Sequence, residues 1–257
     1  MKRIIARDYS LHLHRGLSVE VDGKPVVGWA IELRQGGNFS PMRSTYVENI
    51  EGTEVTVEIL AGMSAPPPDD SDPSDRLDSE SRSGWYIICN GRVVVAADKS
   101  DLTGWGTEGW PKWHPQYSGF IGILIFSAKD ALALPLTTTK RSVDTSQPLF
   151  RRALPKMRSA SKEWITYTNA RKSQMEEAKA LEKQAERVSI FEIPIRKETA
   201  LPQLQAKPRE KVANILYTVP LKRAQALATA FGYVGMSYKE IGLKSFEYAF
   251  DDLVEDE

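Results

Sequence analysis

The chain has 257 residues, and its 34 lysines and arginines are balanced by 34 aspartates and glutamates. A formal net charge of zero excludes a histone-like or tail-driven nucleic-acid binder, which depends on a large excess of positive charge. One cysteine and three histidines exclude a disulfide framework and a cysteine-rich zinc module. No apolar run approaches the ~20 residues of a membrane helix, and the N-terminus lacks the apolar stretch of a signal peptide. We therefore expect a soluble, cytoplasmic protein of one large or two small domains.

The first half of the chain shows the alternation of apolar and polar residues that is typical of β-structure. Before this alternation begins, residues 1–16 predict a short amphipathic helix. Turn signals at Asp22-Gly23 and Asn90-Gly91 each predict a β-hairpin, the second through a type I′ turn. We expect four to six strands in one mixed or antiparallel sheet. The strand-forming segments are 17–27, 53–60, 85–97 and 120–126.

An acidic stretch interrupts this pattern. Residues 66–83 contain six acidic side chains and almost no apolar ones. Such a stretch buries too little apolar surface to offset the entropy that is lost on ordering. We predict a disordered loop over 63–83, and we favour a solvated insertion over a functional acidic segment.

The second half of the chain is mainly helical in character. Pro148 suits the first turn of a helix that runs toward Arg158. Residues 161–187 are richly charged and free of proline and glycine, so they predict one long helix, with apolar positions too sparse for a coiled coil. Ser237 and Glu240 form a capping box at the start of the last helix. Beyond the long helix we expect strands over 188–195 and 215–219 and helices over 221–231 and 237–253.

These elements predict an α+β protein with a mixed or antiparallel sheet, a long charged helix and a small C-terminal α/β domain. The sequence shows no internal repeat. The predicted parts are an α+β domain over 1–160, a connecting helix over 161–187 and a C-terminal domain over 188–257.

Three features that could carry chemistry, a GxGxxG match, His114 and Cys89, have structural interpretations. Residues 104–109 match GxGxxG, but a dinucleotide fingerprint must open a helix, and the tryptophans and prolines that follow cannot do so. We expect this aromatic loop to pack on the sheet or on a partner. His114 stands beside a proline with no second histidine or cysteine near it, so a structural role is favoured and no metal site is predicted. Cys89 lies in an apolar hairpin strand and should be buried.

A basic region follows the predicted sheet. Residues 140–172 carry nine basic residues against two acidic ones, a local charge of +7. Such a stripe can face the phosphates of nucleic acid or of a nucleotide, and a solvated helix face explains it equally well. The basic residues are Lys140, Arg141, Arg151, Arg152, Lys156, Arg158, Lys162, Arg171 and Lys172.

The loop that precedes this region contains Thr137, Thr138, Thr139 and Lys140 in succession. It lies between a predicted buried strand and a predicted helix. Hydroxyl groups and a flexible ammonium in such a loop can bind an anionic group. Taken alone the signal is weak, because threonines before a lysine are common.

Several segments, taken together, resemble the second half of a bacterial GHKL-type ATPase. That family includes gyrase B, MutL, histidine kinases, the MORC proteins and the ninety-kilodalton chaperone. The resemblance covers most of the chain and is best over residues 84–158. The matching segments are LHRGLSVEVDGKPV, FSPMRSTYVENIEGTEVTVEILAG, GWYIICNGRVVVAADKSDLTGWG, FIGILIFSAKDALALPLTTTKRSVDTSQPLFRRALPKM and MSYKEIGLKSFEYAF.

The half of the family that this chain resembles is the transducer domain, a β-sheet with helices on one face. There, a lysine within a Gln/Thr-Thr-Lys-like motif reaches the γ-phosphate of ATP. The resemblance implies this catalytic role for Lys140, with Thr138 and Thr139 as neighbouring cofactor-binding residues. It also implies a bacterial protein, and by analogy with relatives both phage defence and DNA maintenance stay open as its biological process.

The chain lacks the sequence motifs of that family's nucleotide site. It has no helix with a catalytic glutamate and a Mg²⁺-anchoring asparagine, no DxGxG loop and no GxxGxG lid. We do not expect it to bind ATP or Mg²⁺ alone. Both would be held by a partner nucleotide-binding domain, on another chain or lost by truncation. The implied function is that of a transducer and interaction subunit, which relays ATP hydrolysis into conformational change.

Two other functions remain open from the residues alone. A non-enzymatic nucleic-acid-binding adaptor would use part of the basic region, namely Arg151, Arg152, Lys156, Arg158 and Lys162. A structural oligomerisation module would form a homodimer through the helix over 161–187, although its sparse apolar seam weakens that hypothesis.

Overall fold

The computed structural model describes residues 1–68, 81–204, 213 and 215–254. It divides the chain into two compact units, Met1–Pro208 and Arg209–Glu257, and each is described by itself. Most of the predicted acidic loop, residues 69–80, lies outside the described residues.

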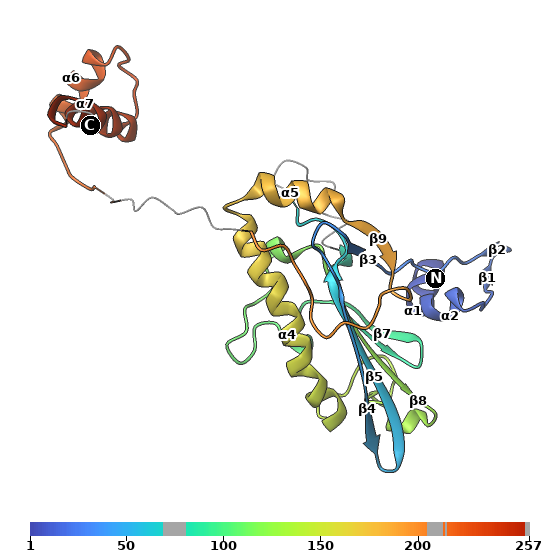
Figure 1. Cartoon of the computed structure of the whole chain (residues 1–257). Helices are drawn as coiled ribbons and strands as arrows, with labels where there is room; N and C mark the ends of the chain where they lie inside the picture. Colours follow the sequence, from blue (N-terminus) through green and yellow to red (C-terminus); the bar gives the residue numbers. More distant parts are fainter. Residues whose placement is uncertain (69–80, 205–212, 214, 255–257) are drawn as a thin grey trace. The chain divides into compact units, whose positions relative to one another are not determined.

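A five-stranded sheet forms the centre of the first unit (Figure 1). Its strands are β4 (Met42–Ile50), β5 (Thr53–Met63), β6 (Gly84–Cys89), β7 (Arg92–Asp98) and β8 (Phe120–Ala128). The strand order is β4-β5-β8-β6-β7, and β6 and β8 run parallel while the other neighbours are antiparallel. This arrangement confirms the predicted α+β class and its mixed sheet.

Both predicted hairpins are present. Asn90 and Gly91, which join β6 to β7, have φ angles of 46° and 80°. Two successive positive φ angles are the requirement of a type I′ turn, and the short side chain of asparagine tolerates them. Asp22 and Gly23 have φ angles of 53° and 68° and connect a short hairpin. Its strands are β1 (Glu20–Val21) and β2 (Lys24–Pro25).

Helix α4 (Pro148–Arg171) covers one face of the sheet (Figure 1). Pro148 occupies its first turn, as predicted. Phe150, Met157 and Trp164 recur at helical spacing on its buried side and pack against the side chains of β5, β6 and β8. The indole N–H of Trp85 donates to the hydroxyl of Ser161 over 3.2 Å, which joins β6 to α4.

A second apolar cluster closes the opposite face of the sheet. Its residues come from the sheet and from both ends of the first unit, including Leu11, Leu33, Ile190 and Ile193. Helices α1 and α2 lie beside β7 at this side. Covering elements are therefore found on both faces, whereas the family resemblance implied helices on one. The elements concerned are α1 (Lys2–Asp8), α2 (Ser10–His14), β3 (Glu32–Gln35) and β9 (Glu186–Ser189), of which β3 and β9 pair antiparallel.

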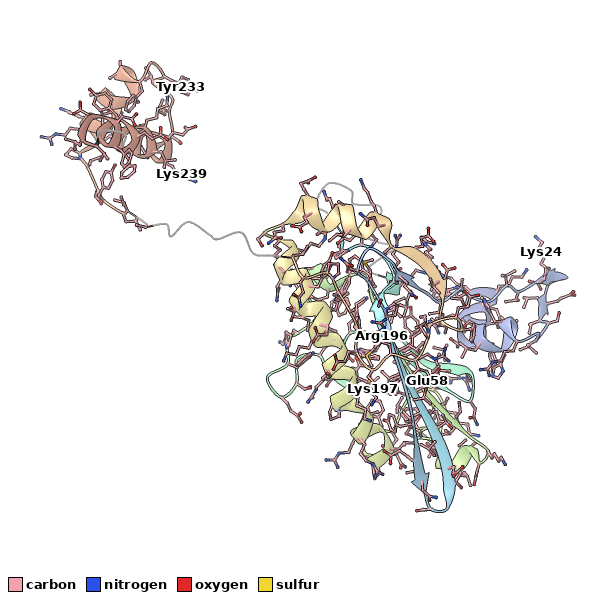
Figure 2. The ribbon with its side chains drawn as sticks, in the orientation of Figure 1. Lys24, Glu58, Arg196, Lys197, Tyr233 and Lys239 are labelled. Carbon is pink, nitrogen blue, oxygen red and sulfur yellow. The ribbon has the colours of Figure 1, made fainter. Side chains whose placement is uncertain are left out.

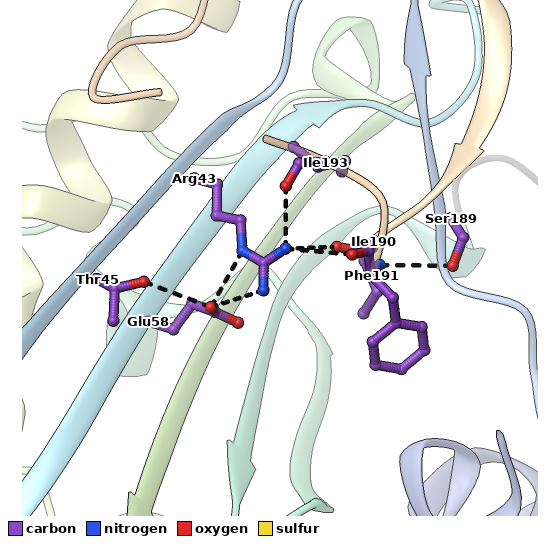
Figure 3. A network of polar contacts seen from close by, with 7 residues as sticks. All are labelled: Arg43, Thr45, Glu58, Ser189, Ile190, Phe191 and Ile193. Atoms are coloured by element: carbon purple, nitrogen blue, oxygen red, sulfur yellow. Dashed lines mark hydrogen bonds and ion pairs between the residues drawn. The ribbon is translucent and has the colours of Figure 1, made fainter. Parts of the chain in front are cut away.

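Arg43 of β4 holds the segment after β9 onto the sheet (Figure 3). Its guanidinium donates to Glu58 on β5 over 2.9 and 3.1 Å, and to the backbone carbonyl of Ile193 over 2.9 Å. The backbone of Arg43 pairs with that of Arg196, and Ser40 pairs in the same way with Ala200. Figure 2 labels Glu58 and Arg196 on this part of the unit. Residues 196–200 thus run along the start of the edge strand β4.

The long helix expected over 161–187 is divided in the structure. α4 ends at Arg171, and a separate helix, α5 (Met175–Gln184), follows a short turn. The helix ends here because Arg171 forms an ion pair with Glu182 of α5, and both side chains are buried. Residues eleven positions apart on one straight helix could not meet, so this pairing requires the chain to turn back. The strand expected over 188–195 is the shorter β9, which belongs to the first unit. The division between the units therefore lies at residue 208 rather than at 160 or 188.

The described part of the second unit is helical. It contains α6 (Leu221–Ala230) and α7 (Tyr238–Leu253), and residues 215–219 form no strand, so the α/β character predicted for the C-terminal domain is not found there. The predicted capping box is confirmed, because the Ser237 hydroxyl and the Glu240 side chain each bond the other's backbone N–H. Among the helices that the structure describes, none is long and apolar enough to cross a membrane.

Candidate functional site

The loop between β8 and α4 is anchored at its base. After a short 3-10 turn, η3 (Ala131–Ala133), the side chains of Leu134 and Val143 enter the core that α4 covers. Leu136 and Val143 form an isolated antiparallel bridge, so the chain between them is a small hairpin loop. Burial of Leu134 and Val143 holds the base of this loop against the sheet and α4.

Residues 137–142 form the tip of this loop. Two bonds close it: the N–H of Thr137 donates to the carbonyl of Ser142 over 3.1 Å, and the N–H of Lys140 donates to the carbonyl of Thr137 over 2.8 Å. Lys140 has a φ of 54°, an unusual conformation for a lysine. The side chains of Thr138, Thr139 and Lys140 are all exposed. The structure therefore brings these three predicted site residues together at one exposed turn.

The loop begins where β8 ends, at the end of the sheet that also carries the Asn90-Gly91 turn. The side-chain amide of Asn90 donates to the carbonyl of Ala128 and accepts from its N–H, at 3.0 and 2.9 Å. On the other side of the loop, the carboxylate of Asp144 accepts hydrogen bonds from the backbone and the hydroxyl of Ser146. These bonds lower the pKa of Asp144 and keep it charged. The loop thus leads through a fixed turn into the first residues of α4.

The five basic residues of the nucleic-acid alternative lie on α4, where helical geometry divides them into two groups. Arg151, Arg158 and Lys162 are spaced seven and four residues apart and share one face. Arg152 and Lys156 are four residues apart and share a second face, toward β4. The sequence alone did not separate these two groups.

Arg152, Lys156 and Arg158 make direct contacts within the chain, and Arg151 interacts electrostatically with Glu108. Arg152 forms an ion pair with Glu48 of β4 at 3.3 Å. The ammonium of Lys156 lies 3.7 Å from the centre of the Tyr46 ring. Arg158 binds the carboxylate of Glu108 and, over 2.8 Å, the hydroxyl of Thr107. Of the wider basic region, Arg171 is buried in its ion pair with Glu182. These contacts engage much of the positive charge of the basic region within the chain and so reduce what is available to bind a nucleic acid.

The aromatic loop around the GxGxxG match packs into the core between the sheet and α4. Packing on the sheet was one of the two predicted arrangements. Trp105 is buried, and its ring lies 4.9 Å from that of Trp113 and 5.6 Å from that of Tyr117. Two 3-10 turns, η1 (Asp101–Thr103) and η2 (Pro115–Tyr117), frame the loop. His114 caps the second turn by accepting the N–H of Gln116, a structural role that agrees with the prediction.

The first unit contains a small pocket that the sequence does not predict. It has a volume of about 60 Å³ and lies between α2, the chain before β3 and the chain after β9. The ring of His14 lies 5.9 Å from that of Phe191 at this pocket, and the hydroxyl of Ser10 is buried without a hydrogen-bond partner among the described residues. Its lining comes from segments far apart in sequence, and no motif marks them.

No family model, curated protein or solved structure matches this chain. The resemblance to GHKL transducer domains therefore remains a prediction from the sequence segments. Within the part of the chain that the structure describes, no group of three or more His, Cys, Asp and Glu residues is arranged to hold a metal ion.

Proposed function

We propose that this chain is a transducer and interaction subunit of a GHKL-type ATPase. In this proposal Lys140 contacts the γ-phosphate of an ATP molecule that a partner nucleotide-binding domain holds together with Mg²⁺. The observation that carries the proposal is the exposed turn of Thr138, Thr139 and Lys140 on a loop with a buried base. The quoted sequence segments supply the family context.

The geometry suits a sensor of a phosphate group. An ammonium on an exposed turn can reach a ligand outside the chain, and its interaction energy depends strongly on whether one phosphate is present. The base of the loop is packed in the same core as α4, and only a few residues separate Val143 from Pro148. A shift of the loop on loss of the phosphate would therefore be passed to the first turns of α4.

The test begins with the partner. Affinity purification of the tagged chain from its native cells, with mass spectrometry of what co-purifies, is expected to yield a protein that carries the missing asparagine helix and glycine loops. Recovery of the chain without such a protein would contradict the proposal.

With the reconstituted pair, Lys140→Ala is expected to lower kcat for ATP hydrolysis by about 100-fold or more, the loss typical of a removed transition-state contact. Arg141→Ala is the matched control, because Arg141 is the next residue of the same turn and is also exposed. It should leave kcat within about threefold. Unchanged turnover in Lys140→Ala would reject the role of Lys140.

The alternative of a nucleic-acid adaptor rests mainly on Arg151 and Lys162, since the other three residues make direct ion-pair or cation–π contacts within the chain. It predicts binding that weakens steeply with salt and that is reduced in the Arg151→Ala, Lys162→Ala double variant. Absence of binding at low salt would reject this alternative.

A further inference from the structure

An exposed apolar stripe runs along α7 in the second unit. It is formed by Leu243, Phe246, Phe250 and Leu253, which are 53%, 54%, 47% and 79% exposed. The intervals between them are three, four and three residues, so the four side chains lie on one face of the helix. The rings of Phe246 and Phe250 stack at 6.3 Å. This spacing is that of the contact seam of a coiled coil.

The second unit has little core of its own. The buried residues of its two helices are Ala224, Ala228 and Ile241, two of which are alanines. A unit this small gains little stability from such a core, and small domains commonly add a partner surface. Contiguous exposed apolar side chains mark such surfaces. The stripe is therefore suited to packing against another helix.

We propose that the stripe is the interface of a homodimer, in which α7 packs antiparallel against α7 of a second copy of this chain. The stripe has the same order of intervals when it is read from either end. A twofold axis at the level of Tyr248 would therefore place Leu243 against Leu253 of the second copy, and Phe246 against Phe250. A self-complementary patch of this kind is the requirement of an isologous twofold interface.

Charge on α7 favours the antiparallel direction. The first half of the helix carries Lys239 and Lys244 with one acidic residue, whereas the second half carries Glu247, Asp251 and Asp252 with no basic residue. Acidic side chains in a last turn are disfavoured by the helix dipole. Lys244 lies over the Phe231 ring of the same unit, 5.8 Å from its centre, so its charge acts on the partner only at longer range. An antiparallel partner still brings the more basic half of one helix level with the acidic half of the other, whereas a parallel partner would place the two acidic halves together.

Lys239 adds to this complementarity. It precedes Leu243 by four residues, and helical geometry therefore places it on the face of the stripe. Figure 2 labels Lys239 in the second unit. Since Leu243 lies level with Leu253 in the antiparallel pair, Lys239 would lie about one turn beyond the C-terminal end of the partner helix, where the negative end of the helix dipole attracts a cation. This inference does not depend on the function proposed for Lys140.

The first experiment measures the mass of the full chain by light scattering over a range of concentrations. We expect a concentration-dependent rise from 28.8 kDa toward twice that mass. Phe246→Glu should raise the dissociation constant of the dimer by about 30-fold or more, as loss of an interface hot spot does. The matched control is Tyr248→Glu, because Tyr248 is 69% exposed on the opposite face of the same helix, and it should leave the dimer intact.

A chain that stays at 28.8 kDa at every concentration would overturn the proposal, as would a dimer that Phe246→Glu does not weaken. Because Phe246 is half exposed in the single chain, its replacement should preserve the helix content seen by circular dichroism.

The second experiment tests the direction of the pair by disulfide trapping. A tagged Leu243→Cys chain is mixed with an untagged Leu253→Cys chain, both in a Cys89→Ala background. The antiparallel pair predicts disulfides between the two different chains. Disulfides that join only identical chains would indicate a parallel pair and would contradict the arrangement proposed here.

Discussion

Two ionisable side chains, Tyr86 and Cys89, are buried in the sheet and a third, Tyr46, is partly buried there, and burial disfavours their charged forms. It raises the pKa of the Cys89 thiol to about 12, and it is the main cause that raises the pKa values of Tyr46 and Tyr86 to about 12. Cys89 is therefore a small apolar residue of the core at neutral pH, as its place in an apolar strand predicted. Its thiol should be inert toward alkylating reagents in the native chain.

These groups set an alkaline limit to stability. In the unfolded chain the thiol and the phenols lose their protons near pH 9 and 10, whereas in the folded chain they retain them until about pH 12. The unfolded state thus binds fewer protons in this window, and the free energy of unfolding should fall as the pH rises from about 9 to 12. Urea titrations at a series of pH values measure this slope. Cys89→Ala and Tyr86→Phe should each reduce it, and a flat profile would contradict the prediction.

A buried network of hydrogen bonds and an ion pair joins α4 to α5. Arg171 donates to the two oxygens of the Glu182 carboxylate over 2.7 and 3.1 Å, and the hydroxyl of Tyr167 donates to the same carboxylate over 2.7 Å. Both charged side chains are buried. Burial and the hydrogen bond to Glu182 raise the pKa of Tyr167. Arg171 is the direct ion-pair partner of the Glu182 carboxylate, which also interacts electrostatically with Arg34.

Removing one charge of the pair should therefore be costly. Arg171→Met leaves the buried Glu182 carboxylate without its direct ion-pair partner, and we expect it to lower the free energy of unfolding by about 3–5 kcal/mol. The double variant Arg171→Met, Glu182→Leu should be clearly more stable than the single one, because the buried carboxylate is removed together with its ion-pair partner. Urea unfolding of the two variants and the parent chain measures both effects. A double variant less stable than Arg171→Met would contradict this account.

The elements that local sequence could predict are those with local causes. The two hairpins follow from Asp22-Gly23 and Asn90-Gly91, and the last helix from its capping box. The end of α4 could not be predicted, because its cause is a pairing between Arg171 and Glu182 rather than a proline or a glycine. The length of β9 likewise depends on β3, at the other end of the unit.

The candidate site likewise has features with a local cause in the sequence and features that depend on contacts between distant segments. Three adjoining threonines and a lysine single out the loop at Lys140 only weakly, and the phosphate-binding role predicted for it rests on the family resemblance. The partners of the basic residues could not be inferred, because Glu48, Tyr46 and Glu108 come from distant parts of the chain and meet α4 only in the fold. A count of charges along the sequence therefore overestimated the basic surface.

At the scale of the whole molecule, the two units have separate cores. The two apolar clusters of the first unit contain no described residue from the second. Deletion of residues 209–257 should therefore leave the urea midpoint of the first unit unchanged within error, and it should abolish the self-association proposed for α7. Denaturation and light scattering of the shortened chain measure the two outcomes. A large loss of stability would show that the first unit depends on the second.

The pairing of β3 with β9 has a consequence for the order of events during synthesis. The strands of the central sheet are complete once β8 has left the ribosome, but β9, Ile190 and Ile193 emerge much later. Until then one face of the sheet lacks part of its apolar cover, and the start of β4 lacks its backbone partners from residues 196–200. Contacts so distant in sequence form slowly, and exposed sheet edges in such intermediates favour aggregation. The nascent chain should therefore depend most on chaperones in the interval between the emergence of β8 and that of residue 200.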